Sequence, residues 1–216
     1  MINLCVPVLK RYDLLREMVQ SAVVNTMPPD VYYVIDNGRD EDQLTAALDD
    51  LPILAYVHVP REGPMGVAEA WNWFIQRTTE ERFIVNDDIL FAPESIAKMV
   101  EAKAAFVSCS FGFSCFLLRD ACVRKVGLFD ETISPGYAYF EDMDYLRRMR
   151  LEDVADDVVL CDVVHRQSST PQKFTPREWD EHYRKFNLAQ MNYMRKWANN
   201  PNWEQLKAIG GNGAHQ

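Results

Sequence analysis

The chain has 216 residues, of which 48% are apolar, and its 32 acidic and 23 basic residues give a net charge of −9. This length and apolar content predict one globular domain with an extension and exclude wholesale disorder. The negative charge disfavours nucleic acid as a partner, because the basic field that would attract a phosphate backbone is missing.

The cysteines and the N-terminus indicate where the protein is kept. Five cysteines occur, without a C-x-x-C pair or a zinc-ligand spacing. We expect reduced, mostly buried thiols. The N-terminus has no basic segment before a long apolar run, and no window approaches the ~20 apolar residues of a membrane span. The sequence therefore predicts a soluble cytoplasmic protein.

The first half of the chain alternates short apolar runs with amphipathic stretches, the pattern of βαβ units. Helices should follow the first three of four expected strands, which lie at residues 4–9, 31–35, 53–59 and 83–85. The clearest helix follows Pro64, where apolar residues recur at helical spacing: Val67, Ala70, Trp71, Phe74 and Ile75. The expected fold class is α/β, with a mainly parallel central sheet flanked by helices and nucleotide bound at its carboxyl edge.

The second half has a different rhythm. Strands are expected at 106–108, 113–118 and 158–164. Asp120 is a plausible N-cap for a short helix ending at Gly127, and other helices should cover about 93–103 and 140–150. A capping box at Thr175 to Glu178, with Pro176 at the first helical position, predicts a long final helix. We therefore expect a domain over 1–170, divided into halves 1–90 and 91–170, and a helical extension over 171–216.

Acidic residues follow two of the expected strands. Asn86-Asp87-Asp88 ends the strand at 83–85, and paired acids at such an edge can hold a divalent cation against a diphosphate. The alternative is that these acids cap a turn. Asp36 ends the strand at 31–35, where open α/β sheets place ligand contacts, although Asp-Asn-Gly is also a tight-turn sequence.

Further motifs follow in the second half: Gly-x-Phe-Asp-Glu from Gly127, Phe-Glu-Asp-x-Asp from Phe140, and Val-His ending at His165. Together with the first strand, the Asp36 turn, residues 66–72 and Asn86-Asp87-Asp88, they resemble the family-2 glycosyltransferases, most closely the rhamnosyltransferase-like members. The resemblance covers about residues 1–170. It implies the nucleotide-binding fold called GT-A.

The resemblance also implies roles for individual residues. Asp36 would bind the donor's nucleobase, and Asp87 its ribose or the metal shell. Asp88 would bind a metal ion, Mn²⁺ or Mg²⁺, that bridges the diphosphate. Asp142 would be the catalytic base, and His165 a further ligand of the metal or the diphosphate.

The chain departs from the family pattern at two places. The usual Pro-x-x-Asn after the first strand is here Pro7 to Lys10, which weakens the assignment of the base pocket. The usual basic residue before Asn72 is Trp71, which leaves Arg61 as the substitute candidate for contacting diphosphate. Pro7 and Asn72 remain candidate donor-binding residues.

Simpler interpretations stand beside these roles. Glu141, paired with Asp142 as a catalytic candidate, could with it only complement the dipole of a helix N-terminus. His165 could be a solvent-facing imidazole. The loop around Gly136 carries aromatic residues that form a platform for a sugar ring or pack under the loop: Tyr137, Tyr139 and Phe140.

The expected activity is inverting transfer of a hexosyl or deoxyhexosyl group from a UDP- or dTDP-sugar to an acceptor hydroxyl. A divalent cation would neutralise the leaving diphosphate and one carboxylate would serve as base. The acceptor could be a glycan, a protein or another hydroxyl compound. Two alternatives are a sugar-1-phosphate nucleotidyltransferase, for which a Gly-rich phosphate loop is missing, and a non-catalytic sugar-nucleotide or glycan-binding module.

Overall fold

The computed structural model describes residues 1–53, 56–59, 65–79, 81–166, 173–198 and 200. The first half of the chain forms strand–helix units in sequence order: β1 (Ile2–Val8), α1 (Tyr12–Val23), β2 (Val31–Asp36), α2 (Glu41–Leu48), β3 (Tyr56–Val59), α3 (Val67–Arg77) and β4 (Glu81–Val85). The second half continues with β5 (Ile89–Phe91), α4 (Ser95–Glu101), β6 (Phe106–Cys109), β7 (Gly112–Leu118), α5 (Asp120–Val126), α6 (Glu141–Leu151), β8 (Asp156–Val158), β9 (Val163–His165) and α7 (Pro176–Ala198).

The central sheet is built mainly from parallel strands. Within the described residues it has seven strands in the order β3-β2-β1-β4-β7-β6-β8. Strands β3, β2, β1 and β4 are parallel, whereas β7 runs antiparallel to both β4 and β6. The carboxyl ends of β1, β2 and β4 therefore meet at one edge of the sheet. The α/β fold class expected from the sequence is confirmed.

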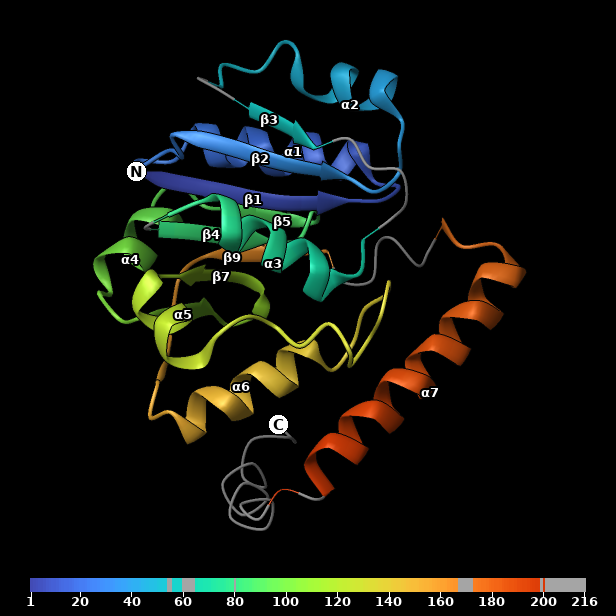
Figure 1. The fold of residues 1–216 in the computed structure, drawn as a ribbon. Coiled ribbons are helices and arrows are strands. Elements are labelled where there is room, and N and C mark those ends of the chain that lie inside the picture. The colour runs from blue at the N-terminus through green and yellow to red at the C-terminus, as the bar shows by residue number, and fades with distance from the viewer. Residues whose placement is uncertain (54–55, 60–64, 80, 167–172, 199, 201–216) are drawn as a thin grey trace.

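Helices cover both faces of this sheet. One face packs against α1, α2 and α4, in a core that contains Leu15, Met18, Leu44 and Met99. The other face packs against α3, α5 and α6, in a core centred on the buried rings of Trp71, Phe74, Phe116 and Tyr145. The result is a three-layer α/β/α arrangement, with α7 lying to one side, near α6 (Figure 1).

The elements match most of the expected ones. Helix α3 buries most of the predicted apolar face, and α5 ends at Val126, with Gly127 as its C-cap at a positive φ of 82° that glycine favours. Helix α7 starts with the expected capping box, because Thr175 N donates to Glu178 Oε2 at 2.8 Å. All five cysteines are free, four of them buried. Among the described residues, no helix is both long and apolar enough to cross a bilayer.

Three expectations need correction. The strand expected at 158–164 is two strands in different sheets: β8 pairs with β6, and β9 pairs with β5. The chain turns between them, and Leu160 is 87% exposed there. Strand β5 was not expected, because three residues are too short to show a period. Asp120 is the first helical residue of α5 rather than its N-cap, which is Arg119.

Candidate active site

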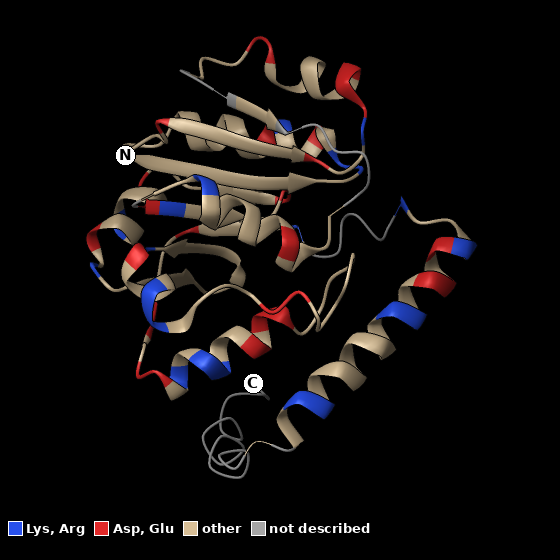
Figure 2. Ribbon diagram, viewed as in Figure 1, with Lys and Arg blue, Asp and Glu red and all other residues tan. Residues whose placement is uncertain are grey.

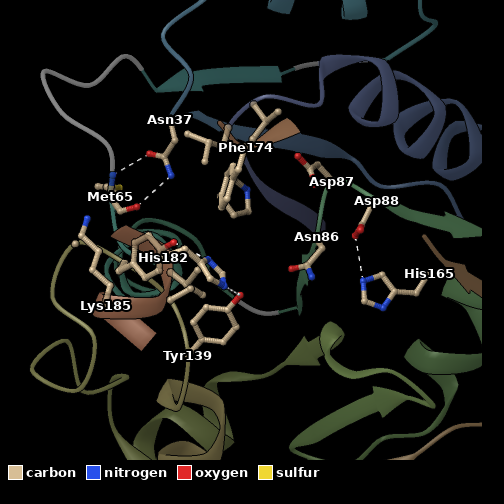
Figure 3. A pocket seen from close by; sticks show the side chains of 17 residues that line it. Asn37, Met65, Asn86, Asp87, Asp88, Tyr139, His165, Phe174, His182 and Lys185 are labelled. Carbon is tan, nitrogen blue, oxygen red and sulfur yellow. Dashed lines mark hydrogen bonds and ion pairs between the residues drawn. The ribbon is translucent and has the colours of Figure 1, made fainter. Parts of the chain in front are cut away.

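The carboxyl ends of β1, β2 and β4 open into a cleft of about 480 Å³. Strand β4 leads directly into Asn86, Asp87 and Asp88, and all three residues line the cleft. Figure 3 shows Asn86, Asp87, Asp88 and His165 on one side, and Asn37, Met65 and Lys185 on the other. The remaining lining comes from five places, the end of β1, the start of α3, the loop before α6, the segment leading into α7 and α7 itself: Pro7, Val8, Leu9, Val67, Gly136, Tyr137, Ala138, Tyr139, Phe174 and His182.

The small sheet of β5 and β9 brings Asp88 and His165 together. Ile89 pairs with His165 in this antiparallel ladder, and Arg166 N donates to Asp88 O at 3.0 Å. As a result His165 Nε2 lies 3.2 Å from Asp88 Oδ1, as the dashed line in Figure 3 marks. The rings of Phe111 and His165 pack edge to face, with their centroids 5.3 Å apart. Two residues far apart in sequence thus form one polar corner of the cleft.

This corner fits a hard divalent cation. Asp88 is 6% exposed, and its Oδ1 is a buried carboxylate oxygen that accepts no hydrogen bond within the described residues and lies beside the imidazole. Carboxylate oxygen suits Mg²⁺ and Mn²⁺, and a neutral imidazole can add a ligand. No group of three or more His, Cys, Asp or Glu ligands occurs among the described residues.

Asp87 lies next to this corner and is also buried. Burial, with a further contribution from the Asp88 charge, raises the pKa of Asp87 to about 7, and the nearby Arg11 opposes the shift. Two adjacent carboxyl groups at 8% and 6% exposure are costly without a cation. The arrangement is therefore an anionic site that gains from a bound positive charge.

Asp36 lies at the end of β2 but does not line the cleft. It is 2% exposed, and its Oδ1 accepts from Tyr12 Oη at 2.5 Å and from Arg39 N at 2.9 Å. His58 Nε2 lies 3.7 Å from its other oxygen. The next residue, Asn37, faces the cleft instead, and its side chain holds the backbone of Met65 through bonds of 2.9 and 3.2 Å.

Asn72 is placed away from the cleft and holds a loop. Its Nδ2 donates to Phe129 O and Glu131 Oε1 at 2.9 and 2.8 Å, and its Oδ1 accepts from Phe129 N at 2.8 Å. These bonds occupy the side-chain amide, so the structure gives Asn72 a role in fixing the Gly-x-Phe-Asp-Glu segment. Pro7 lines the cleft. Arg61 lies outside the described residues.

The loop after Asp130 crosses the start of α3 and leads into α6. Val67 N donates to Tyr137 O at 2.6 Å, and a Cβ at Gly66 would lie 2.8 Å from the backbone of Tyr137. Only glycine permits this close approach. The contact carries Tyr137 and Tyr139 into the wall of the cleft, directly before Glu141 and Asp142.

Glu141 and Asp142 open α6 in two different environments. Glu141 is 4% exposed with Oε2 lacking a hydrogen-bond partner in the described structure, and burial raises its pKa to about 8. Asp142 is half-buried, and Met143 N donates to its Oδ1 at 2.8 Å. Burial also raises the pKa of Asp142. Glu141 and Asp142 are not among the residues that line the cleft, but Tyr139, two residues before Glu141, is a lining residue. Figure 2 shows the acidic first turn of α6.

Asp144, in the same acidic motif, is part of the structural framework. It is fully buried, and Trp197 Nε1 donates to its Oδ1 at 2.9 Å. Arg148 Nε lies 2.9 Å from Oδ2, and Lys196 Nζ 2.7 Å from Oδ1. Asp144 therefore anchors the end of α7 to α6.

The pKa of Glu141 makes the effect of Glu141→Gln on stability dependent on pH. Its usual value is 4.5 and the folded value is about 8, so the folded protein keeps a proton that the unfolded chain releases between these pH values. Stability therefore falls as pH rises through this window. Glutamine keeps the size of the protonated acid without titrating. We expect the Tm of Glu141→Gln to equal the wild-type Tm near pH 4.5 and to exceed it at pH 8. At pH 8 the free energy of unfolding of the variant should be larger by on the order of a few kcal/mol.

Thermal unfolding from pH 4.5 to 8.5 measures this difference. Glu152→Gln, at the exposed end of α6, is the matched control and should show no such trend. A constant Tm difference between Glu141→Gln and wild type across this range would contradict the shifted pKa.

Sequence reasoning missed the contribution of the C-terminal segment to the cleft. Phe174, His182 and Lys185 line it, although the motifs in the sequence all precede residue 170. The signal was an apolar and aromatic face at helical spacing in α7: His182, Phe186, Ala189, Tyr193 and Trp197. The boundary expected at residue 170 lies outside the described residues.

Comparison with known proteins identifies the fold and the family. A model of the family "Glycosyl transferase family 2" matches residues 4–112, half of the chain. The mannosyltransferase PcManGT from Pyrobaculum calidifontis, solved in complex with GDP-Man and Mn²⁺, has a TM-score of 0.63 and 14% identity, over 100% of this chain and 76% of that chain.

Two structures of S. aureus TarS are also similar. One has a TM-score of 0.54 and 12% identity, over 74% of this chain and 35% of that chain. The other, of TarS 1-349, has a TM-score of 0.53 and 15% identity, over 74% of this chain and 58% of that chain. A search of curated proteins found no match. At these identities the structural likenesses show the fold, whereas the family match covers the strands that build the cleft. The chain therefore belongs to glycosyl transferase family 2 and is a glycosyltransferase with the mainly parallel α/β fold of the GT-A type.

Proposed function

We propose that this glycosyltransferase transfers a hexosyl or deoxyhexosyl group from a UDP- or dTDP-sugar to an acceptor hydroxyl, with inversion at the anomeric carbon and with a divalent cation. The observation that carries the proposal is the pairing of Asp88 with His165, 3.2 Å apart, in a cleft at the carboxyl ends of β1 and β4. Open α/β sheets bind nucleotides at this edge.

Asp88 Oδ1 and His165 Nε2, which lie 3.2 Å apart, would hold the proposed cation. When bound, a divalent cation stabilises the charge that develops on the leaving diphosphate. Asp87 lines the same part of the cleft, and we propose that it contacts the ribose or the metal shell. The mannosyltransferase with the similar fold was solved with Mn²⁺, which supports the choice of Mn²⁺ or Mg²⁺.

The nucleoside is proposed to lie across the ends of β1 and β2. Pro7, Val8 and Asn37 line this part of the cleft, and the Phe174 ring faces it. Asp36 lies behind this surface, so we propose that it supports the base pocket through its bonds to Tyr12 and Arg39.

Asp142 is proposed as the base. It is half-buried, its pKa is raised by burial, and Met143 N donates to its Oδ1, so we propose that Oδ2 meets the acceptor. Asp142 takes the proton of the acceptor hydroxyl as that oxygen attacks the anomeric carbon. The bond from the anomeric carbon to the diphosphate oxygen breaks as the new bond forms, and its electron pair leaves with the nucleoside diphosphate. Glu141, with a pKa of about 8, is protonated at neutral pH and is a poor base there.

A binding panel tests the donor and the cation together. Thermal shifts would be measured with UDP, dTDP and GDP, each with Mn²⁺, Mg²⁺ or EDTA. GDP is included because the similar mannosyltransferase was solved with GDP-Man. We expect UDP or dTDP at a hundredfold excess over Kd, with Mn²⁺ or Mg²⁺, to raise the Tm by ~5 to 10 °C. The shift should be much smaller in EDTA.

Calorimetry then gives the affinity of the best nucleotide with and without the cation. Equal affinity in both conditions would remove the cation from the proposal, and tighter binding of GDP would replace the proposed donor. Release of nucleoside diphosphate from the matching sugar nucleotide would follow, since water can serve as the acceptor. Binding without any release would contradict catalysis.

A further inference from the structure

Two consecutive residues with left-handed backbone precede the proposed base. Tyr139 has a φ of 89° and Phe140 a φ of 69°, and neither is glycine. Such conformations are costly for residues other than glycine and persist only where surrounding contacts hold them. Phe140 is the residue before the first turn of α6. The backbone conformation of Tyr139 and Phe140 therefore sets the direction in which α6 starts, and with it the direction of the Asp142 side chain.

Helix α7 supplies the contacts that hold this loop. The ring of Phe186 packs against Tyr139 and Phe140 at centroid distances of 5.0 and 5.3 Å. Tyr193 stacks on Phe140 at 5.5 Å. Both strained residues are therefore clamped by one face of a helix that comes from the C-terminal end of the chain.

His182 connects the same helix face to the cleft wall by hydrogen bonds. It is 9% exposed, its Nδ1 lies 2.7 Å from Tyr137 Oη, and its Nε2 lies 3.4 Å from Tyr139 Oη. A neutral imidazole has one donor and one acceptor nitrogen, so it can bridge two hydroxyl groups. Figure 3 shows His182 beside Tyr139 at the wall of the cleft.

We propose that His182 is a positioning residue for the transfer reaction. By bridging Tyr137 and Tyr139, His182 holds the two left-handed residues, Tyr139 and Phe140, that orient the proposed base, Asp142. Helix α7 thus helps to position the base for the reaction. This inference rests on the proposed role of Asp142. The far end of α7 is anchored separately, through Trp197 and Lys196 to Asp144, so a change at His182 should leave the helix docked.

The test uses His182→Phe, which keeps an aromatic ring in the cluster and removes both nitrogens. We expect kcat for nucleoside diphosphate release from the sugar nucleotide to fall about 10- to 100-fold, since small misplacements of reacting groups cost this much. The affinity for the nucleoside diphosphate with Mn²⁺ should stay unchanged. His182→Asn, whose amide can replace Nδ1 toward Tyr137, should recover part of kcat. Tyr183→Phe is the matched control, because Tyr183 is 60% exposed on the same helix.

Hydrogen exchange of the full-length protein gives a readout that needs no turnover. Amides of residues 139–144 should exchange faster in His182→Phe, and those of α3 and β4 should not change. Unchanged exchange at 139–144, or unchanged kcat, would overturn the inference. A weaker nucleotide affinity with unchanged kcat would also overturn it, because His182 would then be a ligand contact. If the wild-type protein released no nucleoside diphosphate, the proposed function would fail while the exchange result still tested the clamp.

Discussion

Asp142→Asn is expected to lower kcat by ~10² to 10⁴, because the amide cannot accept a proton from the acceptor hydroxyl. Asparagine keeps the size of the side chain, and its Oδ1 can still accept the hydrogen bond from Met143 N. The start of α6 should therefore remain intact. Asp142 is not among the residues that line the cleft, so nucleotide affinity should stay near the wild-type value.

The measurement combines turnover, nucleotide binding and thermal unfolding on one variant. If Asp142 served only as an acidic residue at a helix N-terminus, the substitution would cost at most ~1 kcal/mol of stability and spare turnover. Glu141→Gln is the companion variant, since it removes the neighbouring carboxyl. Near wild-type turnover of Asp142→Asn, with a large loss in Glu141→Gln, would move the base to Glu141.

Helices and strands with a clear period were predictable from the sequence. Helix α3 buries Ala70, Trp71 and Phe74, as their helical spacing predicts. The parallel strands follow from the alternation of apolar runs and amphipathic stretches. Strand β5 was not predictable, because Ile89–Phe91 becomes a strand only through its pairing with β9. The apolar run at 158–164 does not indicate where pairing with β6 ends and pairing with β5 begins.

The motifs did not predict what each of their side chains contacts. The proximity of Asp88 to His165 depends on that same pairing of β5 with β9, which is tertiary information. Asn72 belongs to the motif set, yet its amide is occupied by Phe129 and Glu131 because the loop folds back on α3. His182 lies outside every motif, and only the helical face that it shares with Tyr193 indicated that it would be buried.

Asp88→Asn should abolish the gain in nucleotide affinity that Mn²⁺ or Mg²⁺ provides. The amide keeps the shape of the side chain and removes the charge that would hold the cation beside His165. Because a divalent cation contributes several kcal/mol of charge stabilisation to the leaving group, turnover should fall by ~10³. The Tm should stay constant or rise, since the substitution removes one of two adjacent buried charges.

Calorimetry with and without EDTA separates this role from that of a turn cap. A capping carboxylate would lower the Tm on substitution and leave the dependence on the cation unchanged. Asp162→Asn, on the exposed loop before β9, matches the change in charge and should behave as wild type. His165→Gln should weaken the same dependence, and Asp88→Asn combined with His165→Gln should lose no more than Asp88→Asn alone, because the two residues share one ion. Additive losses in the double variant would show that Asp88 and His165 bind different groups, and the proposed cation site would then have to be abandoned.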